Sequence, residues 1–396
     1  MEQHLLHIFN PWHDLALANN RSNYLPPASA LKMADDLSLL PAWIAGPGDF
    51  VLTENALCRV GKADEAALIL ENCTFVEPSA LDSFLVEPKP WGWDLPLHRI
   101  LRKLSPELNL PSLEELEAIR SLSSRSLAVQ VLSVLNLMEL PYVTGESFLC
   151  SQVEQIEPLI EKYHDVFMKQ LWSSSGKGLR PIACGEFSEH LQNWCSRSIQ
   201  QHGGVVLEPR YRRVLDFAME FQFAGGEIEF CGYSVFFTDR NGHYAGNMLA
   251  SEELLEGEIL RNLGITDDRV LSSIKLALMH LLTPKLVSIY DGPFGVDMMI
   301  VELENGERRI HPCVEINLRF NMGQLATKLY EKHVLHGRKG VFNIDFSPKD
   351  GQMLVAHKQM LEQYPLQCVD GRVEKGYLAL NPIHEKTAYR AYVLLE

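Results

Sequence analysis

Three side chains late in the sequence have the types and spacing of a metal site. Asp297 lies in the otherwise apolar run 295–300, and Glu315 and Asn317 follow at a spacing of two. Side chains alternate along a strand, so Glu315 and Asn317 are expected to share a face. Carboxylate and amide oxygens are donors that Mg²⁺ prefers, usually together with phosphate and water. The alternative interpretation is an edge pair of solvated carboxylates.

The turn between the two strands decides whether these side chains can meet. Asn305 and Gly306 mark that turn in the sequence. A two-residue turn there would place Asp297 and Glu315 on opposite faces of the hairpin. A shared metal ion therefore requires a turn with an odd number of residues, or a β-bulge. We predict one of these two features, and two separate faces would exclude the shared site.

A second group of residues has the composition of a phosphate-binding loop. Lys169 ends a short apolar strand and precedes a loop of small residues and one further lysine, namely Ser173, Ser174, Ser175, Gly176, Lys177 and Gly178. Such residues let backbone N–H groups turn toward an anion, and lysines supply positive charge. A solvated hairpin loop is the alternative. The stretch is not a Walker A loop, because the required spacing and the following helix are absent.

The elements that must position these residues change character along the chain. The first part alternates strand and helix signals, with strands at Leu5–Phe9, Phe50–Leu52 and Thr74–Val76 and helices at Ala28–Leu40 and Ala63–Asn72. This alternation predicts an α/β layer with a parallel sheet. After Pro141 the sequence favours long strands and hairpins, which predicts an α+β region with antiparallel sheets.

Composition limits the class of protein. The chain has 396 residues, a formal charge of −15 and 46% hydrophobic residues. It contains no apolar run of the ~18–20 residues that a membrane span needs, and its first residues lack the pattern of a signal peptide. The acidic balance argues against a large nucleic-acid surface, which needs clustered Lys and Arg. We therefore expect a cytoplasmic protein with no nucleic-acid or membrane partner.

The order of these motifs resembles the ATP-grasp superfamily. The ordered set is Lys169, the Ser/Gly loop, Glu208-Pro209, Asp297 and Glu315-x-Asn317-x-Arg319, and the resemblance runs from about Ser124 to Gly323. It implies an α/β N-terminal domain with a parallel sheet, followed by an α+β ATP-grasp fold of two subdomains with antiparallel sheets. The implied boundaries are 1–120 for the first domain, 121–204 for the subdomain with the phosphate loop and 205–396 for the subdomain with the metal site.

The resemblance also implies a nucleotide-binding role for several residues. Lys169 would contact the nucleotide phosphates, and the loop from Ser173 to Gly178 would close over them. Glu208 would begin the hinge that reads the adenine edge, and Asp216 would contact the ribose. The family usually has a lysine upstream of these residues. Here the matching position holds Arg125, whose guanidinium can also bind phosphate.

The remaining matched residues imply the reaction. Asp297, Glu315 and Asn317 would hold Mg²⁺, with Mn²⁺ as an alternative ion, and Arg319 would steady the reacting phosphoryl or carboxyl group. The implied function is an ATP-dependent ligase that joins a small carboxylate to an amine through an acyl phosphate. Two alternatives stay open, an ATP-dependent phosphotransferase and a nucleotide-binding protein without turnover. Relatives often pair, which makes a homodimer one expectation.

A few residues outside these motifs have two interpretations each. The segment Asn10–Asp14 follows the first strand, where open α/β sheets place ligands. His13 and Asp14 either contact substrate or cap a turn, and capping is the more common use of such residues. Trp91 is expected to be a packing anchor rather than a binding platform. Asn321 either lines the reaction centre or caps a helix.

Overall fold

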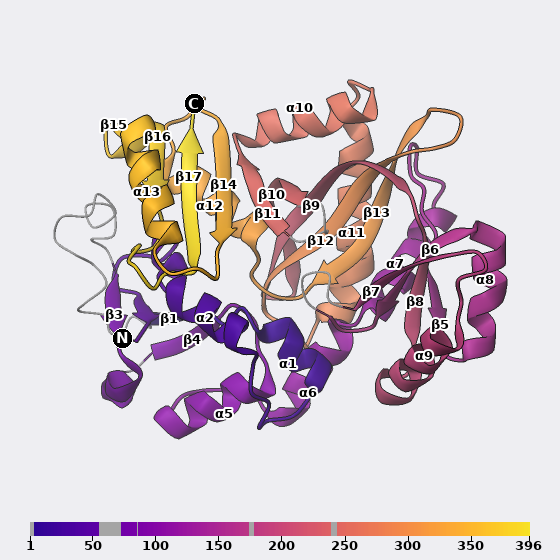
Figure 1. The fold of residues 1–396 in the computed structure, drawn as a ribbon, viewed down its shortest axis with the longest axis horizontal. Coiled ribbons are helices and arrows are strands. Elements are labelled where there is room, and N and C mark those ends of the chain that lie inside the picture. The colour runs from indigo at the N-terminus through magenta and orange to yellow at the C-terminus, as the bar shows by residue number, and fades with distance from the viewer. Residues whose placement is uncertain (1–3, 55–72, 85, 174–177, 239–243) are drawn as a thin grey trace.

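Three β-sheets organise the described part of the chain, and each is built from a consecutive part of the sequence (Figure 1). The protein is described from a computed structural model, which covers residues 4–54, 73–84, 86–173, 178–238 and 244–396. The predicted helix at Ala63–Asn72 lies outside the described residues.

The N-terminal sheet has four parallel strands. Its order is β3 (Thr74–Val76), β2 (Phe50–Leu52), β1 (His4–Ile8) and β4 (Val86–Pro90). The described helices of this region are α1 (His13–Asn19), α2 (Ala28–Asp36), α5 (Leu95–Leu104) and α6 (Leu113–Leu122), with 3-10 turns at Leu40–Trp43 and Pro78–Ser83. Leu6 and Val51 are fully buried at the centre of the sheet. The predicted parallel α/β layer is confirmed.

The second sheet is small and antiparallel, and it carries Lys169 and Glu208. Its order is β5 (Phe148–Cys150), β8 (Val205–Pro209), β6 (Asp165–Gln170) and β7 (Leu179–Ala183). Helices α8 (Ile156–Tyr163) and α9 (Glu189–His202) pack on it, and a 3-10 turn at Val153–Gln155 precedes α8.

The third sheet has nine strands and includes the metal hairpin. In order they are β13 (Arg308–Asn317), β12 (Gly292–Glu302), β9 (Arg212–Ala224), β10 (Glu227–Thr238), β11 (Tyr244–Leu249), β14 (Gly340–Phe346), β17 (Tyr389–Leu395), β16 (Arg372–Ala379) and β15 (Gln367–Val369). The connecting helices are α10 (Glu252–Leu263), α11 (Arg269–Leu286), α12 (Met322–His333) and α13 (Gln352–Gln363). All of the strand pairings in this sheet are antiparallel, as predicted for this part of the chain.

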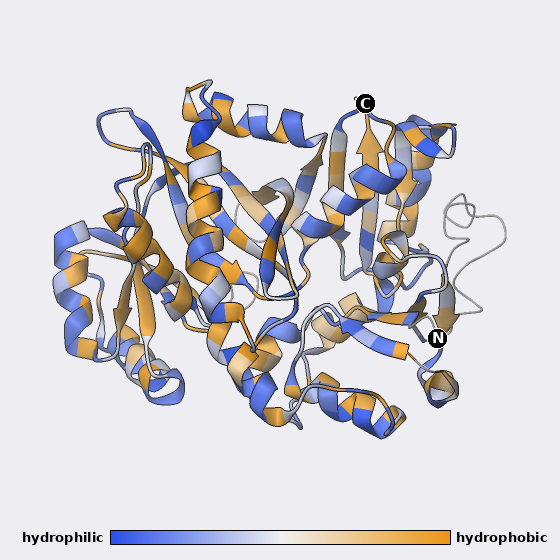
Figure 2. Cartoon of the chain, turned by 180° about the vertical axis from the view of Figure 1, so that it is seen from behind, coloured by the Kyte–Doolittle hydropathy of each residue, from blue (hydrophilic) through white to orange (hydrophobic). Residues whose placement is uncertain are grey.

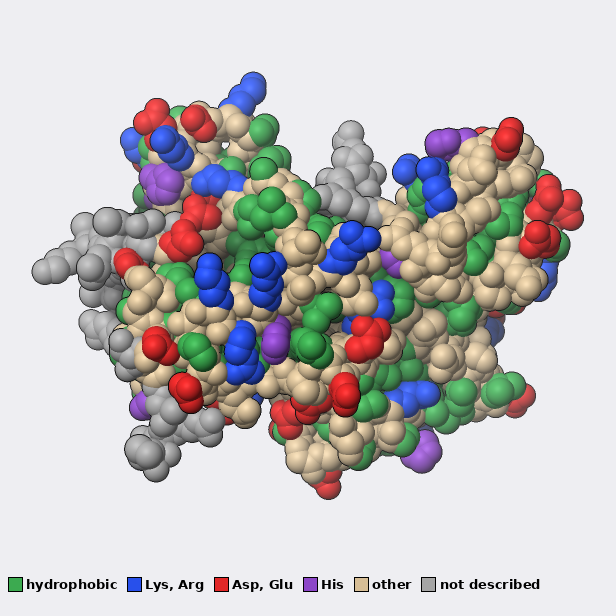
Figure 3. Space-filling model, turned by 90° about the horizontal axis from the view of Figure 1, so that it is seen from below, with side chains coloured by type: hydrophobic (Ala, Val, Ile, Leu, Met, Phe, Trp, Pro, Cys, Tyr) green, Lys and Arg blue, Asp and Glu red, His purple; other side chains and the backbone are tan. Residues whose placement is uncertain are grey.

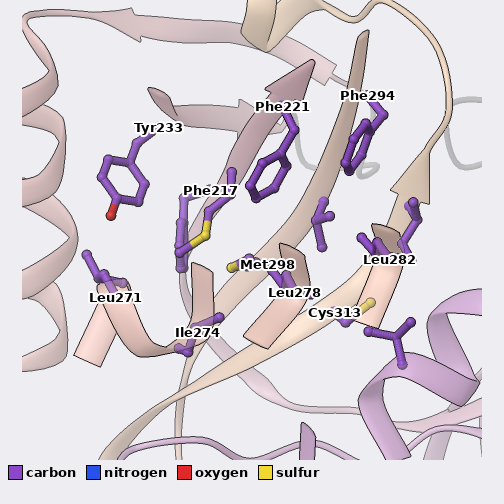
Figure 4. Close-up of a cluster of buried hydrophobic side chains, with 14 of the residues drawn as sticks. Phe217, Phe221, Tyr233, Leu271, Ile274, Leu278, Leu282, Phe294, Met298 and Cys313 are labelled. Atoms are coloured by element: carbon purple, nitrogen blue, oxygen red, sulfur yellow. The ribbon is translucent and has the colours of Figure 1, made fainter. Parts of the chain in front are cut away.

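One face of strands β9, β12 and β13 is buried under helices. Phe217 and Phe221 on β9 and Phe294 and Met298 on β12 pack against α11 and α7 (Arg125–Leu137) in one core (Figure 4). Strand alternation therefore turns residues 216, 218 and 220 of β9 and 295 and 297 of β12 to the opposite face. Figure 2 shows apolar and polar residues interleaved along the helices and strands, seen from behind.

The surface carries charged side chains of both signs. Acidic and basic side chains are interspersed on the face seen from below (Figure 3), so this face does not carry the net charge as a patch of one sign. None of the helices within the described ranges is both long and apolar enough to cross a membrane.

Candidate active site

The β12–β13 hairpin places the three predicted metal ligands on one face. Asp297 pairs directly with Glu315, and Asn317 lies two residues farther along β13. Directly opposed residues of antiparallel strands point to the same side. The alternate residues Val296 and Ile316 are buried in the core on the other side. The predicted common face is therefore confirmed.

Both predicted features of the hairpin contribute to this register. The turn comprises the three residues 304–306 and is closed by a backbone hydrogen bond of 2.8 Å. The pairing then shifts by two residues between Asp297 and Met299. Pro312 lies in the shifted part of β13, where its missing N–H cannot contribute to the ladder. A shift of two residues keeps every side chain on its face, so Asp297 and Glu315 still meet.

The ionised form of Asp297 is unfavourable when no cation is bound nearby. Burial and the nearby charges of Glu315 and Glu220 raise the pKa of Asp297 to about 8. The Asn317 side-chain amide donates a hydrogen bond to Asp297 Oδ2 at 3.0 Å, which offsets part of this effect. A buried carboxyl that cannot easily carry its charge alone gains most from a bound cation.

The donor set fits Mg²⁺. In the described ranges no three His, Cys, Asp or Glu side chains gather to hold a metal. The candidate donors at the hairpin are instead two carboxylates, from Asp297 and Glu315, and the amide oxygen of Asn317. Mg²⁺ is commonly held by one or two carboxylates and completes its shell with phosphate and water.

Arg125 connects the metal hairpin to the predicted phosphate loop. It is the first residue of α7, and its side chain is only 7% exposed. Arg125 Nη2 lies 2.8 Å from Glu315 Oε1. Arg125 Nη1 donates to the Gln170 carbonyl at 2.7 Å and to Ser173 Oγ at 2.8 Å. One guanidinium thus contacts both a predicted metal ligand and the start of the loop.

Lys169 and Glu208 form a buried ion pair between neighbouring strands. Lys169 on β6 contacts the Glu208 carboxylate on β8, and both residues are more than nine-tenths buried. Burial raises the pKa of Glu208, but the charge and hydrogen bond of Lys169, together with the nearby His311 and Arg125, more than offset it and hold that pKa below its usual value. The structure thus brings the predicted phosphate lysine beside the first residue of the predicted adenine hinge.

The two described ends of the predicted phosphate loop lie close together. Gly178 has a φ of +108°, and a side chain there would come within 2.8 Å of Ser173 and Gln170. Glycine is therefore required at this position. The predicted loop residues Ser174, Ser175, Gly176 and Lys177 lie outside the described residues.

Asp216 lies on the face of β9 opposite to the buried Phe217 and Phe221. It precedes Ala218 on β9, which pairs with Asp297. Its carboxylate forms an ion pair of 3.0 Å with Arg213. Burial raises the pKa of Asp216 to about 6 despite this partner. Its contact with a ribose stays a prediction.

The N-terminal helix α1 reaches into this site and contacts Arg319, a pairing that the sequence does not predict. Both Asp14 oxygens accept from Arg319, with Nε–Oδ1 at 2.9 Å and Nη2–Oδ2 at 3.0 Å. The α1 N-terminus is at Trp12, and no side chain caps it. The preferred interpretation of Asp14 as a turn cap is therefore wrong. The sequence of the Asn10–Asp14 segment fits both roles, and the ion pair 305 residues away shows a third one, the orientation of Arg319. A contact of Asp14 with substrate stays a prediction.

Aromatic packing and a helix cap hold the Arg319 segment against the N-terminal sheet. Trp91 packs edge-on against Phe9 and Phe320, with ring centroids 4.8 and 4.7 Å away. The Phe320 N–H donates to the Trp91 carbonyl at 2.8 Å. Asn321 caps α12 by accepting from the Gln324 N–H at 2.9 Å. The anchor role of Trp91 and the cap interpretation of Asn321 are confirmed.

Glu220 is a buried acid near the site that the sequence reasoning missed. It accepts hydrogen bonds from Asn321 at 2.7 Å and from Ser234 at 2.9 Å, and it has no ion-pair partner among the described residues. Burial raises the pKa of Glu220 to about 7. The alternation of Phe217, Met219 and Phe221 could have placed Glu220 on the polar face with Asp216, but not beneath α12.

Several of these residues line one pocket that is open to solvent. It lies between α1, the start of the loop and the end of β13. Its lining includes His13, Asp14, Ser173, Glu315, Asn317 and Arg319. Two of the predicted metal ligands, the first residue of the predicted loop and Arg319 thus line one opening.

Comparison with known proteins identifies the fold. No family model matches the chain, and a search of curated proteins finds no match. Among solved structures, a biotin carboxylase from Campylobacter jejuni in complex with β,γ-ATP matches with a TM-score of 0.51 at 13% identity. The match covers 99% of this chain and 87% of that chain.

A second solved structure agrees. The biotin carboxylase domain of 2-oxoglutarate carboxylase from Hydrogenobacter thermophilus, in complex with MgADP and bicarbonate, matches with a TM-score of 0.50 at 11% identity. The match covers 100% of this chain and 87% of that chain. The protein therefore has the ATP-grasp fold, with a parallel N-terminal sheet followed by two antiparallel sheets.

Proposed function

We propose that the protein is an ATP- and Mg²⁺-dependent ligase that joins a small carboxylate to an amine through an acyl phosphate. The observation that carries this proposal is the common face of Asp297, Glu315 and Asn317, together with the pocket that Arg319 lines with Glu315 and Asn317. Similarity to the two biotin carboxylase structures, whose complexes contain an ATP analogue or MgADP, supports the nucleotide part.

The proposed roles of the residues follow from their charges. Lys169 and Arg125 supply positive charge for the phosphates, and the predicted hinge after Glu208 presents backbone groups to the base. Asp297, Glu315 and Asn317 would hold Mg²⁺, which when bound neutralises charge on the β- and γ-phosphate oxygens. Arg319, held in place by Asp14, would orient the carboxylate and stabilise charge that develops on the transferring phosphoryl group.

The proposed reaction has two steps. A carboxylate oxygen attacks the γ-phosphorus of ATP, the bond to the β-phosphate oxygen breaks, and ADP leaves. The amine nitrogen then attacks the acyl carbon, the C–O bond to phosphate breaks, and the amine gives up a proton. A carboxylate is a poor electrophile, and phosphorylation supplies the leaving group that it lacks.

Calorimetric titration tests the nucleotide and metal parts of this proposal. We expect wild type to bind ATP more tightly with Mg²⁺ than without it. Glu315→Gln should lose most of this dependence on Mg²⁺, while Glu307→Gln, at an exposed position beside the turn of the same hairpin, should keep it. Failure of wild type to bind ATP would contradict the proposal.

Trapping tests the reaction itself. In a screen of small carboxylic acids with ATP, Mg²⁺ and hydroxylamine, a ligase should release ADP and phosphate and yield an acid-dependent hydroxamate. A phosphotransferase would release ADP and yield a stable phosphorylated product without hydroxamate. A nucleotide-binding protein without turnover would release no ADP with any acid.

A further inference from the structure

The predicted metal ligands are already engaged by the protein's own donors. Glu315 is paired with Arg125 at 2.8 Å. The Asn317 amide oxygen accepts from Arg319 Nη2 at 3.1 Å, and the Asn317 amide nitrogen donates to Asp297. A divalent cation that binds Glu315 Oε1 or the Asn317 amide oxygen therefore competes with an arginine contact.

The two arginines differ in what they would lose. Arg319 keeps both oxygens of Asp14 and the Phe320 carbonyl when its contact with Asn317 is broken. Arg125 has one carboxylate partner among the contacts described, and this partner is Glu315. Competition for Glu315 therefore falls on Arg125.

The other contacts of Arg125 determine where its guanidinium would lie after the contact with Glu315 is broken. Its Nη1 stays bound to the Gln170 carbonyl and Ser173 Oγ, and its backbone N–H donates to the Leu171 carbonyl at 3.0 Å. These three contacts all come from residues 170–173, which run from the last residue of β6 to the first residue of the predicted phosphate loop. Releasing Glu315 would leave Nη2 free beside this segment, where a polyphosphate oxygen can accept its hydrogen bond.

We propose that Arg125 is a resident counter-ion that competes with the divalent cation for Glu315. Arg125 keeps the free metal ion bound only weakly, and it gives up Glu315 when a nucleotide polyphosphate offers its guanidinium a new partner. The site therefore selects the metal–nucleotide complex over the free metal ion. This inference rests on the metal site of the proposed function.

Coulomb's law supports a sizeable effect. Two unit charges about 4 Å apart interact by several kcal/mol near a protein surface, although solvent reduces this. Removing the positive charge beside Glu315 should favour a cation there by at least about tenfold in affinity. The same change should weaken binding of the metal–nucleotide complex, because a phosphate partner is lost. The two expected effects have opposite signs, and a general loss of structure cannot produce a tighter metal site.

The experiment measures Mn²⁺ binding to the full chain by electron paramagnetic resonance, first with Mn²⁺ alone and then with Mn²⁺ and ADP. Arg125→Gln should bind free Mn²⁺ at least about tenfold more tightly than wild type, and Mn·ADP more weakly. Arg125→Lys keeps the charge and should retain weak binding of free Mn²⁺. Arg309→Gln removes an exposed Arg–Glu pair of 3.1 Å on the same hairpin and should change neither affinity.

The outcomes separate this inference from the proposed function. Unchanged or weaker binding of free Mn²⁺ by Arg125→Gln would overturn the competition. Tighter binding of both free Mn²⁺ and Mn·ADP would overturn the transfer to phosphate. If Arg125→Gln does not fold, tight binding of free Mn²⁺ by Arg125→Lys or by wild type would overturn the inference. Failure of wild type to bind Mn·ADP would contradict the proposed function itself.

Discussion

The ion pairs Lys169–Glu208 and Arg319–Asp14 both belong to the candidate site, but they join different parts of the molecule. Lys169 and Glu208 lie on neighbouring strands of one sheet, and their side chains are 9% and 5% exposed. Arg319 and Asp14 join the end of β13 to the N-terminal helix α1, and their side chains are 18% and 25% exposed. The first pair is fixed inside one sheet, whereas the second joins the end of β13 to helix α1 at the pocket. We infer that the first contributes more to stability and the second more to the position of a reacting group.

The largest predicted effect comes from breaking the buried ion pair of Lys169 and Glu208. Lys169→Met leaves the Glu208 carboxylate buried without its cation and should lower the free energy of unfolding by about 3–5 kcal/mol. Urea unfolding followed by circular dichroism measures this loss. The double variant Lys169→Met/Glu208→Gln removes the unpaired charge and should recover much of it. A loss below about 1 kcal/mol in the single variant would contradict the difference between the two pairs.

Glu220 sharpens the comparison because it is buried with hydrogen bonds but without a paired cation among the described residues. Its pKa rises from 4.5 to about 7 on folding, so the folded state favours the protonated form. The corresponding stability is fully present below about pH 4.5 and is lost as the pH rises through about 7. Glu220→Gln cannot ionise, and its amide can still accept from Asn321 and donate to Ser234.

The prediction for Glu220 is therefore a change in pH dependence. Glu220→Gln should be more stable than wild type by about 3 kcal/mol above pH 7, and the difference should vanish near pH 4. Urea unfolding of both proteins across this pH range measures it. Glu229→Gln, at an exposed position on β10, serves as the control and should follow wild type. An equal difference at all pH values would show that ionisation of Glu220 is not the cause.

The part of the site that the sequence predicted depends on local geometry. The shared face of Glu315 and Asn317 follows from the two-residue period of a strand, and the position of Asp297 follows from turn length and a bulge. The parallel N-terminal sheet likewise follows from alternating strand and helix signals. Each inference needs only the conformation of neighbouring residues and the pairing of adjacent strands.

The rest depends on contacts that no local pattern encodes. Asp14 meets Arg319 across 305 residues, and the pattern around Asp14 equally fits a turn cap. The sheet order β11, β14, β17 is similarly set by pairing between distant segments. Glu220 lies on the face that alternation predicts, but its burial depends on the helix that follows Asn321. These features arise from packing of elements, which hydrophobic periods and turn residues do not specify.

The smallest predicted change in stability tests the pair at the opening. Asp14→Asn keeps one oxygen acceptor for Arg319, which also retains Asn317 and the Phe320 carbonyl. Helix α1 stays attached through Arg120 Nε, which donates to the Leu17 carbonyl at 2.8 Å. We therefore expect a loss of only about 1–2 kcal/mol in the free energy of unfolding, since the pair is partly exposed. Asp267→Asn, which removes an exposed pair with Arg269, should cost less than about 0.5 kcal/mol.

The same variant should affect the reaction far more than stability. Arg319 without the bidentate Asp14 contact loses its fixed orientation, and misplacement of a charged group by about 1 Å can lower a rate by roughly a hundredfold. ATP affinity with Mg²⁺ should stay within about threefold of wild type, because Asp14 has no assigned contact with the nucleotide. Acid-dependent hydroxamate formation should fall by at least about tenfold. A proportional loss of ATP affinity would instead make Asp14 part of the nucleotide site, and the two ion pairs would then serve the same step.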